Sequence, residues 1–224
     1  NKSRIPFMVG YNRRYDPNIL KIKKDIECGV IGTIQILKIT SRDPSPPDID
    51  YMKNSGGLFL DMSIHDFDMA CYLSQQNVKK VYSTGSVFVD KEIKEIGDID
   101  TAVTTITFEN GSLATIDNSR KANYGYDQRV EVFGSLGMSI SQNQLSNNNI
   151  IANNKGIHYS KPLGFFLERY SQSYISILNE FINCLINKKE ISCGIEAGLD
   201  SLKIALAAKK SLNENRVVNF DEIN

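Results

Sequence analysis

The sequence predicts an α+β fold, with a large, mostly antiparallel sheet and helices packed on one face. Five segments, at 80–90, 101–108, 112–118, 129–133 and 138–141, alternate apolar and polar residues in the manner of β-strands. They follow one another without intervening helices, which favours antiparallel pairing over a doubly wound parallel sheet. Asn110-Gly111 lies between two of them and is a strong signal for a two-residue hairpin.

The elements before this region alternate between strand and helix. Residues 5–10 form a short apolar run that predicts a strand. Asp16 and Pro17 are typical of a helix start, and Gly29 is typical of a helix end. Residues 33–40 alternate well enough to predict a further strand.

The C-terminal part predicts two helices, within residues 168–214, that pack on the sheet. Their apolar stripes are Tyr174, Ile177, Leu178, Phe181 and Leu185, then Ile195, Leu199, Leu202 and Leu206. Val217-Val218 predicts a last short strand, and the Asn-rich segment 143–154 predicts a mobile excursion. Without an internal repeat or an evident linker, we interpret residues 1–224 as one domain.

The composition is that of an ordinary soluble globular protein. Lys plus Arg and Asp plus Glu number 26 each, so no charge excess points to nucleic acid or to an anionic membrane. No apolar run approaches the roughly 18–20 residues that a membrane span needs. The four cysteines are widely spaced, and we expect reduced core residues of a cytoplasmic protein: Cys28, Cys71, Cys184 and Cys193.

The segment 58–73 predicts a helix that is apolar around most of its girth. No Lys or Arg occurs between residues 53 and 79, yet one face carries Asp61, His65, Asp68 and Tyr72 at positions i, i+4, i+7 and i+11. Such a polar stripe must face a partner, water or a ligand. We expect Asp61 to contact the imidazole and raise its pKa, which would make His65 a general base toward an alcohol.

Two other interpretations of this face stay open. An Asp–His pair at this spacing is more commonly a structural hydrogen bond than a catalytic one. Asp61, His65 and Asp68 could also hold a divalent ion, although the rest of the chain offers no clear further ligands.

Three further groups are candidates for binding a substrate. Arg13, beside Arg14 at a strand-to-helix junction, could hold an anion or a hydroxyl, or form a surface salt bridge. Asp43, on a loop stiffened by prolines, could accept hydrogen bonds from a sugar-like ligand or merely form a turn. Tyr124 and Tyr126 flank a glycine and suit either a pocket rim or a sheet edge.

Four blocks of the chain together resemble the glucose–fructose oxidoreductase, inositol dehydrogenase and MocA family. They run over residues 9–17, 41–47, 55–69 and 124–134, and the third is the most specific. Their combination is most similar to the inositol-oxidising members. The resemblance implies that His65 takes a hydroxyl proton while Asp61 orients the imidazole, and that Arg13, Asp43, Tyr124 and Tyr126 contact the substrate.

The resemblance also implies cofactors and partners. It implies a cyclic polyol substrate, with myo-inositol oxidised to 2-keto-inositol and hydride passed to NAD or NADP. Family members begin with a Rossmann domain, but the chain has no G-x-G triplet, so we expect the dinucleotide-binding domain to lie elsewhere and this chain alone to be inactive. The resemblance further implies that the protein forms a dimer or tetramer. The alternative is a non-catalytic sugar-binding or oligomerisation module of the same family.

Overall fold

A computed structural model describes residues 5–223 and contains a seven-stranded sheet in the order β6-β5-β1-β4-β3-β2-β9. Its strands are β1 (Ile34–Arg42), β2 (Val78–Ser86), β3 (Thr101–Phe108), β4 (Leu113–Ser119), β5 (Asp127–Gly134), β6 (Gly137–Ser141) and β9 (Val218–Asn219). All neighbours are antiparallel except β1 and β4, which run parallel. The expected α+β class with a mostly antiparallel sheet is therefore confirmed.

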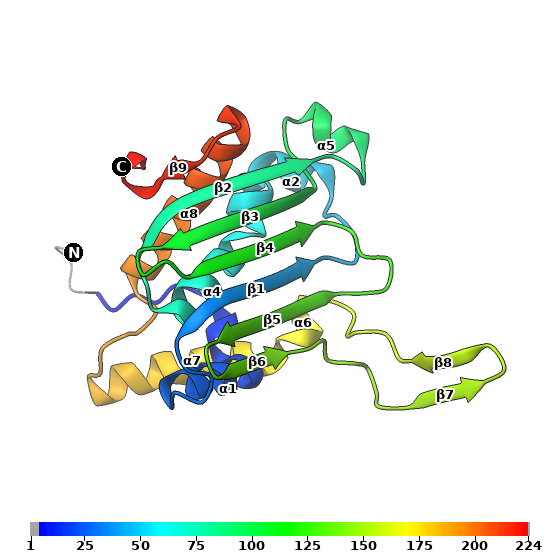
Figure 1. The fold of residues 1–224 in the computed structure, drawn as a ribbon, viewed down its shortest axis with the longest axis horizontal. Helices are drawn as coiled ribbons and strands as arrows, with labels where there is room; N and C mark the ends of the chain where they lie inside the picture. The colour runs from blue at the N-terminus through cyan, green and yellow to red at the C-terminus, as the bar shows by residue number, and fades with distance from the viewer. Residues whose placement is uncertain (1–4, 224) are drawn as a thin grey trace.

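The helices lie on one face of the sheet (Figure 1). They are η1 (Asn12–Tyr15), α1 (Pro17–Glu27), α2 (Ile49–Ser55), α3 (Leu58–Asp61), α4 (Ile64–Ser74), α5 (Lys91–Glu95), α6 (Phe166–Arg169), α7 (Ser171–Asn187), α8 (Ile195–Glu214) and η2 (Phe220–Glu222). Alternate strand residues such as Leu37, Ile106 and Ile116 are fully buried against α4 and α8 and form the core. The helix start at Asp16 is confirmed, because its carboxylate accepts the Asn18 N–H at 3.0 Å.

One predicted strand is not formed. Residues 5–10 are extended but belong to no strand; the Val9 N–H donates to the Cys193 carbonyl at 2.8 Å. The apolar run indicated a strand, but within the described residues it has no sheet edge to join. The Asn-rich segment ends in a small hairpin of β7 (Ile150–Asn153) and β8 (Gly156–Tyr159), which projects from the sheet (Figure 1).

The faces by which the two C-terminal helices pack were predicted wrongly, although α8 does pack on the sheet. Most of the large residues in their apolar stripes are exposed, including Leu178 and Leu199. The side of α8 that contacts β2 and α4 instead carries small residues such as Ala205 and Ala208, which let the helix approach closely. α7 packs against η1 and α6 instead of the sheet.

The four cysteines are free thiols, but only some are core residues. Cys184 and Cys193 are buried and Cys71 is half-buried, whereas Cys28 at the end of α1 is exposed. The expectation of a core position is therefore wrong for Cys28. Among residues 5–223, no helix is both long and apolar enough to cross a membrane.

Candidate active site

The candidate site begins where the parallel strands end. Because β1 and β4 run in the same direction, their carboxyl ends meet at one edge of the sheet, where Arg42 pairs with Ser119. The next residues are Asp43 and Arg120, whose main chains are joined to this edge. The Asp43 N–H donates to the Ser119 carbonyl at 2.9 Å, and the Asp43 carbonyl accepts the Ala122 N–H at 2.7 Å.

A buried ion pair attaches η1 to α4 beside this edge. Arg13 Nη1 donates to Asp66 Oδ1 at 2.5 Å, and Asp66 has no exposed surface. Asn118 on β4 donates to the other Asp66 oxygen at 2.8 Å and accepts from the Ser63 hydroxyl at 2.7 Å. Arg13 is thus held in place by the site, and it is not the surface salt bridge that the sequence left open.

The predicted continuous helix over 58–73 is broken into α3 and α4. The Ser63 N–H donates to the Leu58 carbonyl five residues back, at 2.9 Å, so this turn holds one more residue than an α-turn. The helix then restarts at Ile64. The predicted helix is therefore interrupted between Asp61 and His65.

Asp61 consequently has partners other than the imidazole. Tyr51 on α2 donates its hydroxyl to Asp61 Oδ1 at 2.7 Å, and Arg120 Nη2 donates to Oδ2 at 3.0 Å. The expected contact between Asp61 and His65 is wrong for this structure, since both carboxylate oxygens point to other donors.

His65 lies in an apolar, positively biased environment. The Tyr11 ring packs edge-on against it, with ring centroids 5.8 Å apart, and its Nδ1 is buried without a hydrogen-bond partner. Burial, aided by the charge of Arg13, lowers the pKa of His65 to about 3. The predicted rise in this pKa is therefore wrong, and His65 is a neutral imidazole at physiological pH.

Asp43 faces the same group of side chains. Burial raises the pKa of Asp43 to about 6, against the attraction of Arg120 and Arg13, while Asp66 and Asp61 raise it further. Asp43 is thus close to two further carboxylates and to two guanidinium groups, one of which, Arg13, also acts on His65. This set offers both donors and acceptors, as a polyhydroxylated ligand requires.

Tyr126 lies close to Arg13 and Asp43, whose charges act on its hydroxyl. It is almost fully buried, with its ring edge-on to Phe165 at 5.2 Å and to Tyr170 at 6.3 Å between centroids. Burial raises the pKa of its hydroxyl, against the charge of Arg13, so the phenol is a neutral donor.

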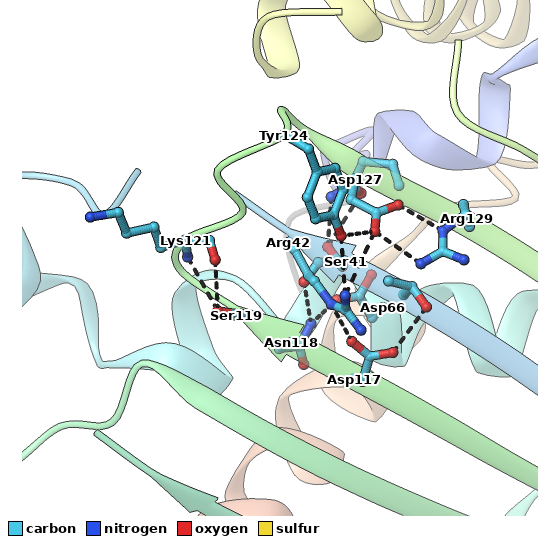
Figure 2. A network of polar contacts seen from close by, with 12 residues as sticks. Ser41, Arg42, Asp66, Asp117, Asn118, Ser119, Lys121, Tyr124, Asp127 and Arg129 are labelled. Atoms are coloured by element: carbon cyan, nitrogen blue, oxygen red, sulfur yellow. Dashed lines mark hydrogen bonds and ion pairs between the residues drawn. The ribbon is translucent and has the colours of Figure 1, made fainter. Parts of the chain in front are cut away.

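Tyr124 lies elsewhere, although it is only two residues away. Figure 2 shows its hydroxyl in a network on the open face of the sheet, donating to Asp127 at 2.5 Å and accepting from Arg42 at 3.1 Å. Asp117 completes this network by accepting from Arg42 at 2.6 Å. The structure therefore does not bring Tyr124 together with Asp61 and His65.

A second arginine–carboxylate pair joins Arg14 to Asp68. Arg14 donates to both oxygens of Asp68, at 2.9 and 2.6 Å. Within residues 5–223, no group of three or more His, Cys, Asp or Glu side chains could hold a metal ion. Arg120 and Tyr51 were missed, because neither lies near Asp61 in a recognisable motif.

A family model described as "GFO/IDH/MocA C-terminal domain" matches residues 19–140, which are 122 of the 224 residues. The chain belongs to this family. It is 46% identical over 222 residues to the myo-inositol 2-dehydrogenase of Thermotoga maritima, covering 99% of this chain and 66% of that protein. The chain therefore spans about two thirds of the length of this relative.

Solved structures of family members share the fold. The crystal structure of a probable dehydrogenase from Thermotoga maritima superposes with a TM-score of 0.97 at 46% identity, over 100% of this chain and 67% of the other. A scyllo-inositol dehydrogenase from Lactobacillus casei, solved with NAD(H) and scyllo-inositol, gives a TM-score of 0.89 at 29% identity over 98% and 66%. Related inositol dehydrogenases therefore bind NAD(H).

The residues of this chain do not fit a dinucleotide pyrophosphate. The glycine fingerprint for that group needs G-x-G at the turn between a strand and a helix, and the 15 glycines of this sequence form no such triplet. The chemistry of this site is therefore that of its own carboxylates, guanidinium groups and imidazole.

Proposed function

We propose that this chain is the substrate-binding portion of an NAD-dependent polyol dehydrogenase that oxidises myo-inositol to 2-keto-inositol. The observation that carries the proposal is the neutral imidazole of His65 next to the charge of Arg13. Arg13 also acts on the buried carboxyl of Asp43, at the end of the parallel strand pair. Membership of a family with inositol dehydrogenases supports the substrate class.

Oxidation of a secondary alcohol removes a hydride from carbon and a proton from oxygen. NAD would accept the hydride. The NAD itself would be bound mainly by polypeptide outside this chain. The part of this chain is to orient the hydroxyl groups and to accept the proton. His65 is suited to accept it because it is already uncharged, and since Nδ1 is buried, the substrate hydroxyl would approach Nε2.

The other side chains have distinct tasks in this proposal. Asp43 and Arg13 accept and donate hydrogen bonds to ring hydroxyls, and Tyr126 donates from its neutral phenol. Asp61 would favour the imidazolium, once the proton has moved to His65, if its carboxylate turned from Arg120 and Tyr51 toward the ring. Tyr124 takes no part, because its hydroxyl is engaged on the other face of the sheet.

We propose further that the chain assembles into a dimer or tetramer through the open face of the sheet. Helices cover only the other face among the described residues (Figure 1). Large apolar side chains on the strands stay exposed there: Ile36, Val103, Leu113, Phe133, Met138 and Ile140. Such a face typically marks a contact surface, and light scattering during gel filtration tests it; a monomer at all concentrations would contradict it.

The function is tested in a chimaera in which this chain replaces the matching 222 residues of the Thermotoga maritima relative. We expect reduction of NAD that depends on myo-inositol, and none with the 224-residue chain alone. The TM-score of 0.97 to the related Thermotoga structure indicates that the graft will fold. A folded chimaera that binds inositol without turnover would contradict the dehydrogenase proposal and favour a sugar-binding module.

A further inference from the structure

Arg120 is the largest fully buried side chain of the described chain, with 1% of its surface exposed. Within residues 5–223 its guanidinium donates to one atom, Asp61 Oδ2, at 3.0 Å, and its buried Nε has no partner. Burying a charge in this way contributes little to stability, since an apolar replacement of a buried ion pair is often neutral or stabilising. The position of Arg120 therefore calls for a role other than stability.

The contact is rigid at both ends. The main chain of Arg120 is fixed where it leaves β4, because its N–H donates to the Asp100 carbonyl at 2.8 Å. At the other end of the contact, the Tyr51 hydroxyl donates a hydrogen bond to Asp61 Oδ1. Both oxygens of the carboxylate are thus occupied, by donors from α2 and from the end of β4.

This arrangement has a consequence for His65, four residues further along the chain. The charged group that acts on the imidazole is Arg13 from η1, and the Tyr11 ring packs against its edge. The nearby carboxylate of Asp66 is held by Arg13 itself. Asp61 is the acid that its place in the chain would bring to the imidazole, yet the imidazole Nδ1 has no partner.

We propose that Arg120 is a positioning residue that, together with Tyr51, holds the Asp61 carboxylate away from the His65 imidazole. The backbone at Met62 and Ser63 is right-handed helical, so we expect the Asp61 carboxylate to turn toward His65 once its partners are removed. Arg120 acts on His65 through Asp61. Only the naming of this site as catalytic rests on the proposed function.

The test uses the 224-residue chain labelled with ¹³C at histidine, which gives signals from just two residues, His65 and His158. In the wild type we expect His65 to stay neutral from pH 8 down to about pH 4.5. In Arg120→Met the released Asp61 pairs with the imidazole, and the midpoint rises by about 1 to 3 pH units, as for an opposite charge at contact distance. In the double variant Arg120→Met/Asp61→Asn the rise disappears.

The matched control is Arg14→Met, which breaks another partly buried arginine–aspartate pair and should leave the His65 midpoint unchanged. Tyr51→Phe changes a side chain that is 55% exposed, so it keeps the test valid if Arg120→Met does not fold; a smaller rise is expected. A folded Arg120→Met or Tyr51→Phe variant with no rise would overturn the proposal, as would a rise that persists without the Asp61 carboxylate. No arm depends on turnover, so failure of the proposed function gives a different result.

Discussion

Asp43 should lower the stability of the folded chain at neutral pH, and Asp43→Asn should therefore stabilise it. Burial raises its pKa from the ordinary value of 3.8 to about 6. A group with a raised folded-state pKa favours folding below its unfolded-state pKa, and that contribution is lost as the pH rises through the folded-state value. The difference corresponds to about 3 kcal/mol against the folded state at pH 7, at about 1.36 kcal/mol per unit.

Urea unfolding at pH 7 and pH 4 measures this effect. We expect Asp43→Asn to raise the free energy of unfolding by up to about 3 kcal/mol at pH 7 and by less than about 1 kcal/mol at pH 4, where the wild-type carboxyl is largely protonated in the fold. Asp48→Asn removes a charge from an exposed position of the same loop and should change stability by less than about 0.5 kcal/mol. An Asp43→Asn variant that is destabilised equally at both pH values would refute the reasoning.

Three further perturbations have worked expectations. His65→Gln should resist acid better than the wild type. The lowered pKa of His65 favours folding above pH 6.5, and the free energy of unfolding falls by up to about 1.4 kcal/mol per pH unit as the pH drops toward 3. Urea unfolding at several pH values checks this slope. Gly57→Ala should lower the free energy of unfolding by about 1–3 kcal/mol, measured by thermal unfolding. Gly57 has φ 88°, and an added Cβ would lie 2.7 Å from an Asp98 carboxylate oxygen. Gly10→Ala should be tolerated, because its added Cβ meets nothing within 4 Å. Arg169→Met leaves Asp16, whose side chain is 3% exposed, without its charged partner. The free energy of unfolding should fall by about 3–5 kcal/mol. An unchanged urea midpoint would show that the pair is weak.

Local patterns predicted the strands well, because each strand has one face on the core. The alternation in 101–108 matches β3, and Asn110-Gly111 lies in the turn to β4. The turn is longer than the expected two-residue hairpin, because β3 ends at Phe108 and β4 begins at Leu113. The parallel pairing of β1 with β4 could not be predicted, since it joins strands about 75 residues apart. That pairing is what places Asp43 next to Arg120.

The site was predicted in composition more than in geometry. Arg13 acts on both His65 and Asp43. The Asp61 carboxylate, however, bonds to donors from α2 and from the end of β4 and not to the imidazole. No spacing rule signals these partners. The carboxylate partner of Arg120 is 59 residues away in sequence, so its role becomes evident only from the fold. The apolar stripes of α7 and α8 predicted the wrong packing faces. Their leucines are mostly exposed, and on α8 buried alanines contact the rest of the fold.

The two histidines of the chain provide the most direct test of the proposed proton acceptor. His65 lies in the candidate site, whereas His158 is an exposed residue of the β7–β8 hairpin. In the chimaera with the Thermotoga maritima relative, His65→Ala should lower kcat for inositol oxidation by at least about 100-fold, as expected for loss of a general base, while His158→Ala should leave kcat unchanged. Equal turnover in the two variants would contradict the role of His65 in proton transfer.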